Sequence, residues 1–233
     1  MYKLLVLIVI FVGITVSESC FKLDASISQK IENEGFHRKI LWLFELLAPK
    51  KEVWDESGCT LSLLFQANPG MYVYPDEIYD LNKKENVSIY VVGDVNIETP
   101  AHESTSHKAF VFIDNNNLGK ISLQLPIHLR YQRAQITGGY GKVYLRRPTL
   151  LAKCPKDGIE ICGNSKRING PCNVSGVETC SWKNVTYQAL FEDVELLVPI
   201  GDLDDYPIVA IFTLMLGCAG CIYMLSILST ASL

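Results

Sequence analysis

Asp202 and Asp204 are the residues of this sequence that most resemble a catalytic pair, because a single residue separates the two carboxylates. Two carboxylates at this spacing can share a divalent cation, and such a pair holds the metal–diphosphate of a nucleotide sugar in many glycosyltransferases. The pair here stands directly before an apolar run, and no nucleotide-binding α/β pattern surrounds it. We therefore interpret it as an acidic segment beside a membrane and expect no catalytic residue there.

The histidines and the common catalytic motifs indicate no further chemistry. None of the four histidines, His37, His102, His107 and His128, has the short spacing to another that is typical of metal ligands. The chain also contains no GxSxG, HExxH, P-loop or GxGxxG motif. We expect no metal and no cofactor, and we predict a binding module rather than an enzyme.

His128 and Arg130 lie on the segment with the clearest strand pattern in the chain. From Ile121 to Gln132, apolar side chains at odd positions alternate with mostly polar ones at even positions, which predicts a half-buried strand. Pro126 stands at an even position and cannot donate to a sheet ladder, so it indicates a sheet edge or a bend. His128 and Arg130 share the polar face. They could bind an anion or lie in solvent, and we predict that they contact a partner protein.

Other segments indicate a mainly β fold. Pro75–Leu81, with two acidic residues after the proline, predicts one short helix, whereas Ile40–Leu47 fits a helix or a strand. Many short strands between turn-rich stretches are typical of an antiparallel sandwich or barrel, and we expect an antiparallel β-sandwich-like domain. The further predicted strands are Leu61–Phe65, Val87–Val92, Ala109–Ile113, Val143–Leu145, Tyr187–Phe191 and Val194–Val198.

The composition excludes some functional classes. The 233 residues carry a net charge of −4, with 48% hydrophobic and 20% charged residues. A nucleic-acid-binding protein normally has a clustered basic excess, and a disordered chain has fewer apolar residues. The length allows one large domain or two small ones, each with a real core. The apolar excess is concentrated at the two ends.

The first apolar run predicts a secretory signal peptide over residues 1–19. Lys3 precedes the uncharged stretch Leu4–Val16, and small residues follow it. We place the cleavage after Ser19. An uncleaved signal anchor is the alternative, although the apolar stretch is short for a membrane span.

The second apolar run, Ile208–Leu228, predicts a transmembrane helix. Ten of its residues are Leu, Ile, Val or Phe, and together they contribute roughly −3 to −6 kcal/mol toward insertion. The small residues at Gly217–Cys221 either let a neighbouring helix approach closely or simply face lipid. A cleaved GPI-attachment signal is the alternative, but no small-residue triplet with a polar spacer precedes the run. We predict a single-pass type I protein in which residues 20–205 are translocated and residues 229–233 form a short cytosolic tail.

Cysteines and glycosylation sequons fit this topology. Zinc sites use tighter cysteine pairs than this sequence offers, so we predict disulfides among the six cysteines of the translocated body, in any of fifteen possible pairings. Three sequons predict N-glycosylation of Asn86, Asn173 and Asn184. The six cysteines are Cys20, Cys59, Cys154, Cys162, Cys172 and Cys180.

Several segments together resemble the phosphatidylinositol-glycan biosynthesis class X family, PIG-X. The most specific is the strand Leu125–Tyr131, with the sequence LPIHLRY. One departure is the absence of a basic residue after the predicted span. The resemblance covers roughly Gly35 to Leu228 and also rests on Gly35–Arg38, Pro69–Val73, Pro75–Glu77, Ile97–Ala101, Arg147–Pro148, the cysteine series from Cys154 to Cys180, and Val198–Gly201.

The resemblance implies a non-catalytic subunit of GPI mannosyltransferase I in the endoplasmic reticulum membrane. Proteins of this family stabilise a multispanning catalytic subunit, the class M protein. That subunit transfers the first mannose from dolichol-phosphate-mannose to the glucosaminyl-phosphatidylinositol precursor during GPI-anchor biosynthesis. A single-pass cell-surface receptor or adhesion protein is the alternative, because such proteins share the plan of one span and a β-rich body.

Overall fold

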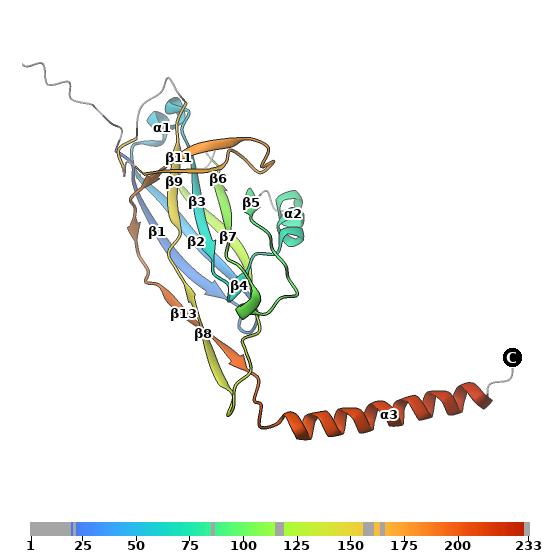
Figure 1. The fold of residues 1–233 in the computed structure, drawn as a ribbon. Coiled ribbons are helices and arrows are strands. Elements are labelled where there is room, and N and C mark those ends of the chain that lie inside the picture. Colours follow the sequence, from blue (N-terminus) through green and yellow to red (C-terminus); the bar gives the residue numbers. More distant parts are fainter. Residues whose placement is uncertain are drawn as a thin grey trace, which may run out of the picture.

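The computed structural model describes residues 20, 22–84, 87–114, 119–155, 161–163 and 166–230. Within these residues the chain forms two large β-sheets, a two-stranded ribbon and a long C-terminal helix (Figure 1). The predicted signal peptide, the sequon at Asn86 and residues 231–233 of the predicted tail lie outside the described residues.

The first sheet has five strands in the order β12-β1-β2-β7-β4. Its pairs are antiparallel except for β1 and β12, which run parallel. Its strands are β1 (Asp24–Glu32), β2 (His37–Ala48), β4 (Met71–Tyr72), β7 (Lys120–Leu129) and β12 (Gln188–Ala189).

The second sheet has six strands in the order β10-β11-β9-β3-β6-β5, all paired antiparallel. Its strands are β3 (Thr60–Ala67), β5 (Ile89–Val92), β6 (His107–Ile113), β9 (Thr149–Lys153), β10 (Arg167–Pro171) and β11 (Thr179–Val185).

The two sheets pack face to face and enclose one apolar core. Trp42 on β2 and Phe65 on β3 are fully buried, and their ring centroids lie 5.9 Å apart across the interface between the sheets. Face-to-face packing of sheets whose inner residues alternate with outer ones defines a β-sandwich. The predicted mainly β fold with antiparallel sheets is confirmed.

The alternating segment forms β7, which lies between β2 and the short edge strand β4 in the first sheet. Its odd positions Leu123, Leu125, Ile127 and Leu129 are buried, as predicted. Pro126 pairs with β2 on one side, while β4 on the other side reaches only the last two residues of the strand. Pro126 therefore needs no second backbone partner, which accounts for a proline in this strand.

Several predicted elements have different limits in the structure. The ambiguous segment Ile40–Leu47 is a strand, because β1 and β2 pair along their length and β7 pairs with the other side of β2. The predicted strand Tyr187–Phe191 is only the two-residue β12. The predicted helix is confirmed as α2 (Pro75–Lys84). The pattern missed the helix α1 (Lys51–Ser57) and the short η1 turn (Ala101–Glu103).

The β10–β11 hairpin folds back over the outer face of the second sheet. Trp182 on β11 is fully buried there against Leu64, Phe110 and Leu151 from three neighbouring strands. The indole nitrogen of Trp182 donates a hydrogen bond to the carbonyl oxygen of Pro171, at 3.0 Å. The second sheet is therefore apolar on both faces over this patch.

The structure has three disulfides among the described residues. Two of them join parts of the chain that are far apart in sequence, and the third closes the β10–β11 hairpin. They pair Cys20 with Cys162, Cys59 with Cys154, and Cys172 with Cys180. The prediction of disulfides is confirmed, and the structure selects this pairing from the fifteen possible ones. Cys59–Cys154 continues the β3–β9 pairing, because Thr60 faces Lys153 in the adjoining register.

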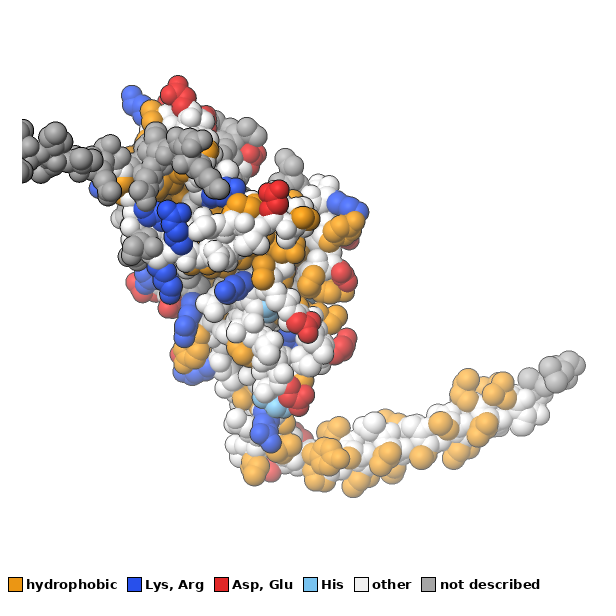
Figure 2. All heavy atoms as spheres, turned by 45° about the horizontal axis from the view of Figure 1, so that its top comes forward, with side chains coloured by type: hydrophobic (Ala, Val, Ile, Leu, Met, Phe, Trp, Pro, Cys, Tyr) orange, Lys and Arg blue, Asp and Glu red, His pale blue; other side chains and the backbone are white. Residues whose placement is uncertain are grey.

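A ribbon connects the sandwich to the C-terminal helix. It consists of β8 (Gly139–Leu145) and β13 (Val194–Ile200). The helix α3 (Tyr206–Thr230) follows directly and has no buried residue in this chain. Its 25 residues and mean hydropathy of 2.3 make it long and apolar enough to cross a membrane. Figure 2 shows no charged side chain along it.

The lengths of chain closed by the disulfides predict unequal contributions to stability. In the chain-entropy model, closing a loop of about 95 residues stabilises by about 4–5 kcal/mol and closing one of about 8 by about 2–3 kcal/mol. We expect Cys59→Ala with Cys154→Ala to lower the free energy of unfolding more than Cys172→Ala with Cys180→Ala. The measurement is urea unfolding of the full chain in detergent, with tryptophan fluorescence as the signal. Equal losses would contradict this ranking.

Candidate functional site

Several of the segments that carry the family resemblance converge at one end of the sandwich, which we term the signature end. It is formed by residues 35–38, 69–77, 97–101 and 125–131. Backbone hydrogen bonds join these segments, with the Leu129 N–H donating to the Phe36 carbonyl and the Arg130 N–H to the Gly70 carbonyl. The Ala101 N–H donates to the Tyr131 carbonyl. In Figure 1 this end faces the ribbon and the start of α3, while α1 lies at the opposite end.

A row of stacked rings crosses the sheet at the signature end. The registers place His37 opposite His128 and His128 opposite Tyr72, so the three residues are cross-strand neighbours on β2, β7 and β4. The ring centroids lie 4.4 Å apart between the two histidines and 5.0 Å apart between His128 and Tyr72. Both pairs are within 14° of parallel. The Arg130 guanidinium continues the row, 4.5 Å from the Tyr72 ring centroid.

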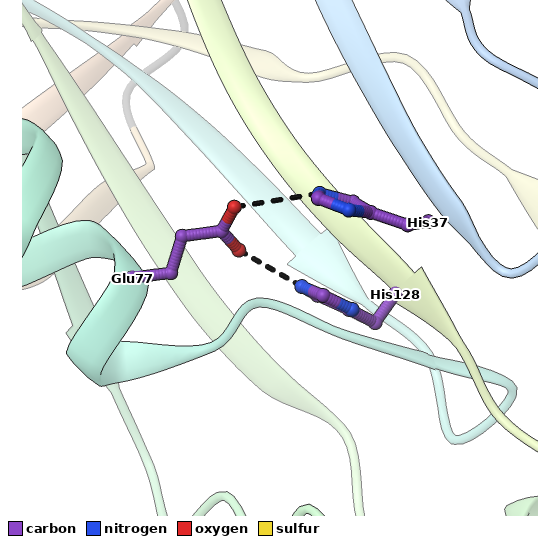
Figure 3. Close-up of side chains that lie close together, drawn as sticks. All are labelled: His37, Glu77 and His128. Atoms are coloured by element: carbon purple, nitrogen blue, oxygen red, sulfur yellow. Dashed lines mark hydrogen bonds and ion pairs between the residues drawn. The ribbon is translucent and has the colours of Figure 1, made fainter.

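Glu77, in the first turn of α2, contacts both histidines of the row. Its Oε2 lies 2.8 Å from His128 Nε2, and its Oε1 lies 3.4 Å from His37 Nε2 (Figure 3). The side chain of His37 is 54% exposed, that of His128 21% and that of Glu77 27%. The cluster is therefore preformed and open to solvent on one side.

The close approach of two histidines could not be predicted from their sequence spacing. His37 and His128 are distant in sequence, yet their ligand atoms and that of Glu77 all lie within 4.8 Å of one another. These three residues are a possible set of metal ligands. Among the described residues, no other group of three or more histidines, cysteines and acidic residues meets the same criterion.

Arg130 is buried, although the alternation places it on the polar face. Its side chain is 4% exposed. Its Nη1 donates to the carbonyl oxygens of Asn96 and Thr99, each at 2.7 Å, and thereby holds the loop that carries residues 97–101. Burial lowers the pKa of the guanidinium, which nevertheless stays charged. Contact of Arg130 with a partner remains a prediction. Because the side chain is buried, we expect Arg130 to affect a partner through the position of the loop that it holds.

His107, at the start of β6, is another buried polar side chain, and it lies near Arg130. Its Nε2 accepts a hydrogen bond from the Val73 N–H at 3.0 Å, so the proton of the neutral ring is on Nδ1. Burial, together with the nearby charge of Arg130, lowers the pKa of His107 to about 4. Protonation of Nε2 would place its N–H against the Val73 N–H, and the hydrogen bond between them would be lost. His107 is therefore a neutral structural residue.

A shallow hollow adjoins the histidine cluster on the side of α2. Its volume is about 610 Å³, and His128 and Glu77 form part of its wall with the aromatic rings of Tyr74 and Tyr79. Tyr79 is 61% exposed. Charged side chains of α2, Asp76, Asp80 and Lys84, line it as well. An open hollow of this kind suits a side chain or short segment of another protein better than a small substrate that must be enclosed.

The acidic pair before α3, Asp202 and Asp204, lies away from the histidine cluster and stabilises a turn. Asp202 Oδ1 accepts a hydrogen bond from the Asp204 N–H at 2.9 Å. The Cβ of Asp202 packs against the turn at Gly138, where a methyl group would meet it at 3.2 Å. Asp202 thus helps to fix the approach to the helix, in agreement with its interpretation as a segment beside a membrane.

The two sequons in the described residues have different surroundings. Asn173 is exposed in the turn of the β10–β11 hairpin, where its Oδ1 accepts hydrogen bonds from Ser175. Asn184 is half-buried on β11 and pairs with Leu151. Glycosylation at both sites remains a prediction, and Asn173 has the more accessible side chain.

Comparisons with known proteins agree with the resemblance. A family model described as PIG-X / PBN1 matches residues 33–229. The relatives that match include proteins of Rattus norvegicus, Mus musculus and Homo sapiens, each named "GPI alpha-1,4-mannosyltransferase I, stabilizing subunit". Each is 25% identical over 177 residues, which is 74% of this chain. The match covers 69%, 68% and 67% of the three relatives, respectively.

The buried neutral His107 predicts a loss of stability in mild acid. Below about pH 6.5 an unfolded histidine takes up a proton, whereas the folded His107 does so only near pH 4. Stability should therefore fall as the pH falls through this window, by at most about 1.4 kcal/mol per pH unit. The measurement is urea unfolding of the full chain in detergent at several pH values between 7.5 and 4.5.

The matched control is His107→Gln, whose amide oxygen can accept the Val73 N–H but does not titrate. Carboxylates contribute equally to both proteins, so the difference in pH slope isolates His107. The same slope in wild type and variant would show that His107 titrates normally in the folded protein.

Proposed function

Because the chain belongs to the PIG-X / PBN1 family, we propose that it is the stabilising subunit of a GPI mannosyltransferase I, as its mammalian relatives are named. Those names denote the stabilizing subunit of the enzyme, so the chain is an accessory protein and not the catalytic subunit. The observation that carries the proposal is the extent of the match. Residues 33–229 include the whole second sheet, the first sheet except β1, the signature end and almost all of α3.

The proposal extends to the location and the partner. The chain is a type I protein of the endoplasmic reticulum membrane, with the sandwich in the lumen. Three disulfides support this location, because such bonds form in oxidising compartments. The partner is the multispanning class M catalytic subunit. It transfers the first mannose from dolichol-phosphate-mannose to glucosaminyl-phosphatidylinositol on the lumenal side.

Stabilisation of a partner follows from differential binding. A protein that binds the folded form of the catalytic subunit, and not its unfolded form, shifts the folding equilibrium by mass action. The apolar helix α3 leaves its whole surface free for contact within the bilayer. The signature end, on the same side of the sandwich as α3, offers a second contact with the hollow beside His128 and Glu77. Two contacts on one chain bind more tightly than either alone.

Loss of the chain should deplete its partner. In cells that lack this protein, we expect less catalytic subunit and fewer GPI-anchored proteins at the cell surface, because unpartnered subunit unfolds and is degraded. The measurements are immunoblotting of the catalytic subunit and flow cytometry of a GPI-anchored marker. Re-expression of the wild type should restore both quantities.

Two controls separate this role from its alternatives. Re-expressed chain with Asp202→Ala and Asp204→Ala should also restore the marker, whereas an enzyme that used this pair would not. The glycans of the chain should stay sensitive to endoglycosidase H, while those of a cell-surface receptor would become resistant. Unchanged amounts of catalytic subunit and marker after deletion would refute the stabilising role.

Substitutions at the signature end should distinguish contact from folding. We expect His128→Ala to lower the amount of catalytic subunit that co-purifies from detergent while changing the urea midpoint of the chain less than Arg130→Ala does, since the His128 ring is partly exposed and Arg130 is buried. Arg130→Ala removes the donor to the carbonyl oxygens of Asn96 and Thr99 and should lower the free energy of unfolding by about 1–3 kcal/mol. Co-purification then falls only in proportion to the folded fraction.

His102→Ala is the matched control, because His102 is also a partly exposed histidine beside a glutamate, Glu103, at 3.4 Å. It should leave both co-purification and stability unchanged. Wild-type co-purification of His128→Ala would exclude His128 from the contact, without bearing on the stabilising role itself.

A further inference from the structure

The cluster of His37, Glu77 and His128 is the strongest unassigned site among the described residues. Each imidazole presents its Nε2 to a different oxygen of one carboxylate (Figure 3). The three side chains come from β2, α2 and β7, so the fold, and not a local sequence motif, brings them together.

The cluster is held in place by rigid elements. The β2–β7 register sets His37 opposite His128. Helix α2 is fixed by the buried Ile78 and by Asn82, whose side chain donates to the Ile89 carbonyl and accepts from the Ile89 N–H. Glu77 is therefore delivered to the histidines by a packed helix. Side chains on rigid elements lose little entropy when they bind an ion, which favours binding.

The donors and their separations match those of a metal centre. Two histidines and one carboxylate are the protein ligands of many zinc sites that keep one position open. At zinc–ligand distances of about 2.1 Å and tetrahedral angles, two ligand atoms lie about 3.4 Å apart. His37 Nε2 and Glu77 Oε1 lie 3.4 Å apart, which matches that value. His128 Nε2 and Glu77 Oε2 lie 2.8 Å apart, a hydrogen-bond distance that has to lengthen when both atoms bind one ion.

We propose that His37, Glu77 and His128 bind a divalent transition-metal ion of the Zn²⁺ type, with the remaining position open to water. The imidazoles are stacked within 14°, so the half-exposed His37 ring turns to bring its lone pair onto the ion shared with His128. Imidazole and carboxylate donors without a thiolate suit Zn²⁺ and its neighbours in the first transition row. The proposal concerns this chain alone and does not rest on the proposed function.

The test is metal binding to the purified full chain in detergent, after treatment with a chelator and its removal. We expect one equivalent of Zn²⁺ to bind in competition with a chromogenic chelator, and Co²⁺ to give the strong visible absorption of a four-coordinate site. Zn²⁺ should also raise the urea midpoint, because it binds the folded state. The loss of an outer-shell group already weakens metal binding by roughly 10–100-fold, so His37→Ala and Glu77→Gln should each weaken it at least as much.

The double variant His37→Ala with His128→Ala should bind no metal, and His102→Ala should bind as the wild type does. Tryptophan fluorescence establishes that each metal-free variant is folded. The absence of saturable Zn²⁺ binding by the wild type up to about 100 μM, or equal binding by the double variant, would overturn the proposal. The cluster would then be only a carboxylate shared by two imidazoles.

Discussion

A buried positive charge organises the end of the molecule that carries the family resemblance. Arg130 is held by carbonyl oxygens of the loop at residues 96–99 and by the face of Tyr72. Because a guanidinium does not lose its proton in proteins, this loop must close over it whenever the chain folds. The same charge adds to the burial that keeps His107 neutral. Neutral His107 in turn accepts the Val73 N–H just before α2, the helix that delivers Glu77 to the two histidines.

Local periodicity predicted the parts of this arrangement that depend on one strand. The buried odd positions of β7 follow from alternation, because only one face of the strand meets the core. The alternation places Arg130 on the polar face of this segment, yet Arg130 is buried, and β7 has already ended at Leu129. The backbone there donates to Gly70 from another segment. Whether a charge at a strand end is buried depends on the carbonyl groups around it, and here distant residues supply them.

The histidine cluster and the disulfide pairing depend on register between strands that are far apart in the chain. No hairpin joins β2 to β7, so no turn in the sequence sets His37 opposite His128. Cys59 and Cys154 meet because β3 pairs with β9, two strands separated by five others along the chain. The sequence predicted that these cysteines form disulfides, since this needs only their number and compartment. It could not predict which pairs form, since that needs the sheet order.

The connection between the ribbon and α3 gives the proposed role a geometric basis. The Gln135 N–H donates to the Gly201 carbonyl, and the Leu203 N–H donates to the Gln135 carbonyl, so the chain is tied to the sandwich until three residues before Tyr206. A flexible linker would let the span and the signature end bind independently, and the gain from joining them falls steeply as such a linker lengthens. A short, hydrogen-bonded connection keeps both surfaces on one side of the body. A partner with transmembrane helices and lumenal loops can then contact both at once, which is the arrangement that favours its folded state most strongly.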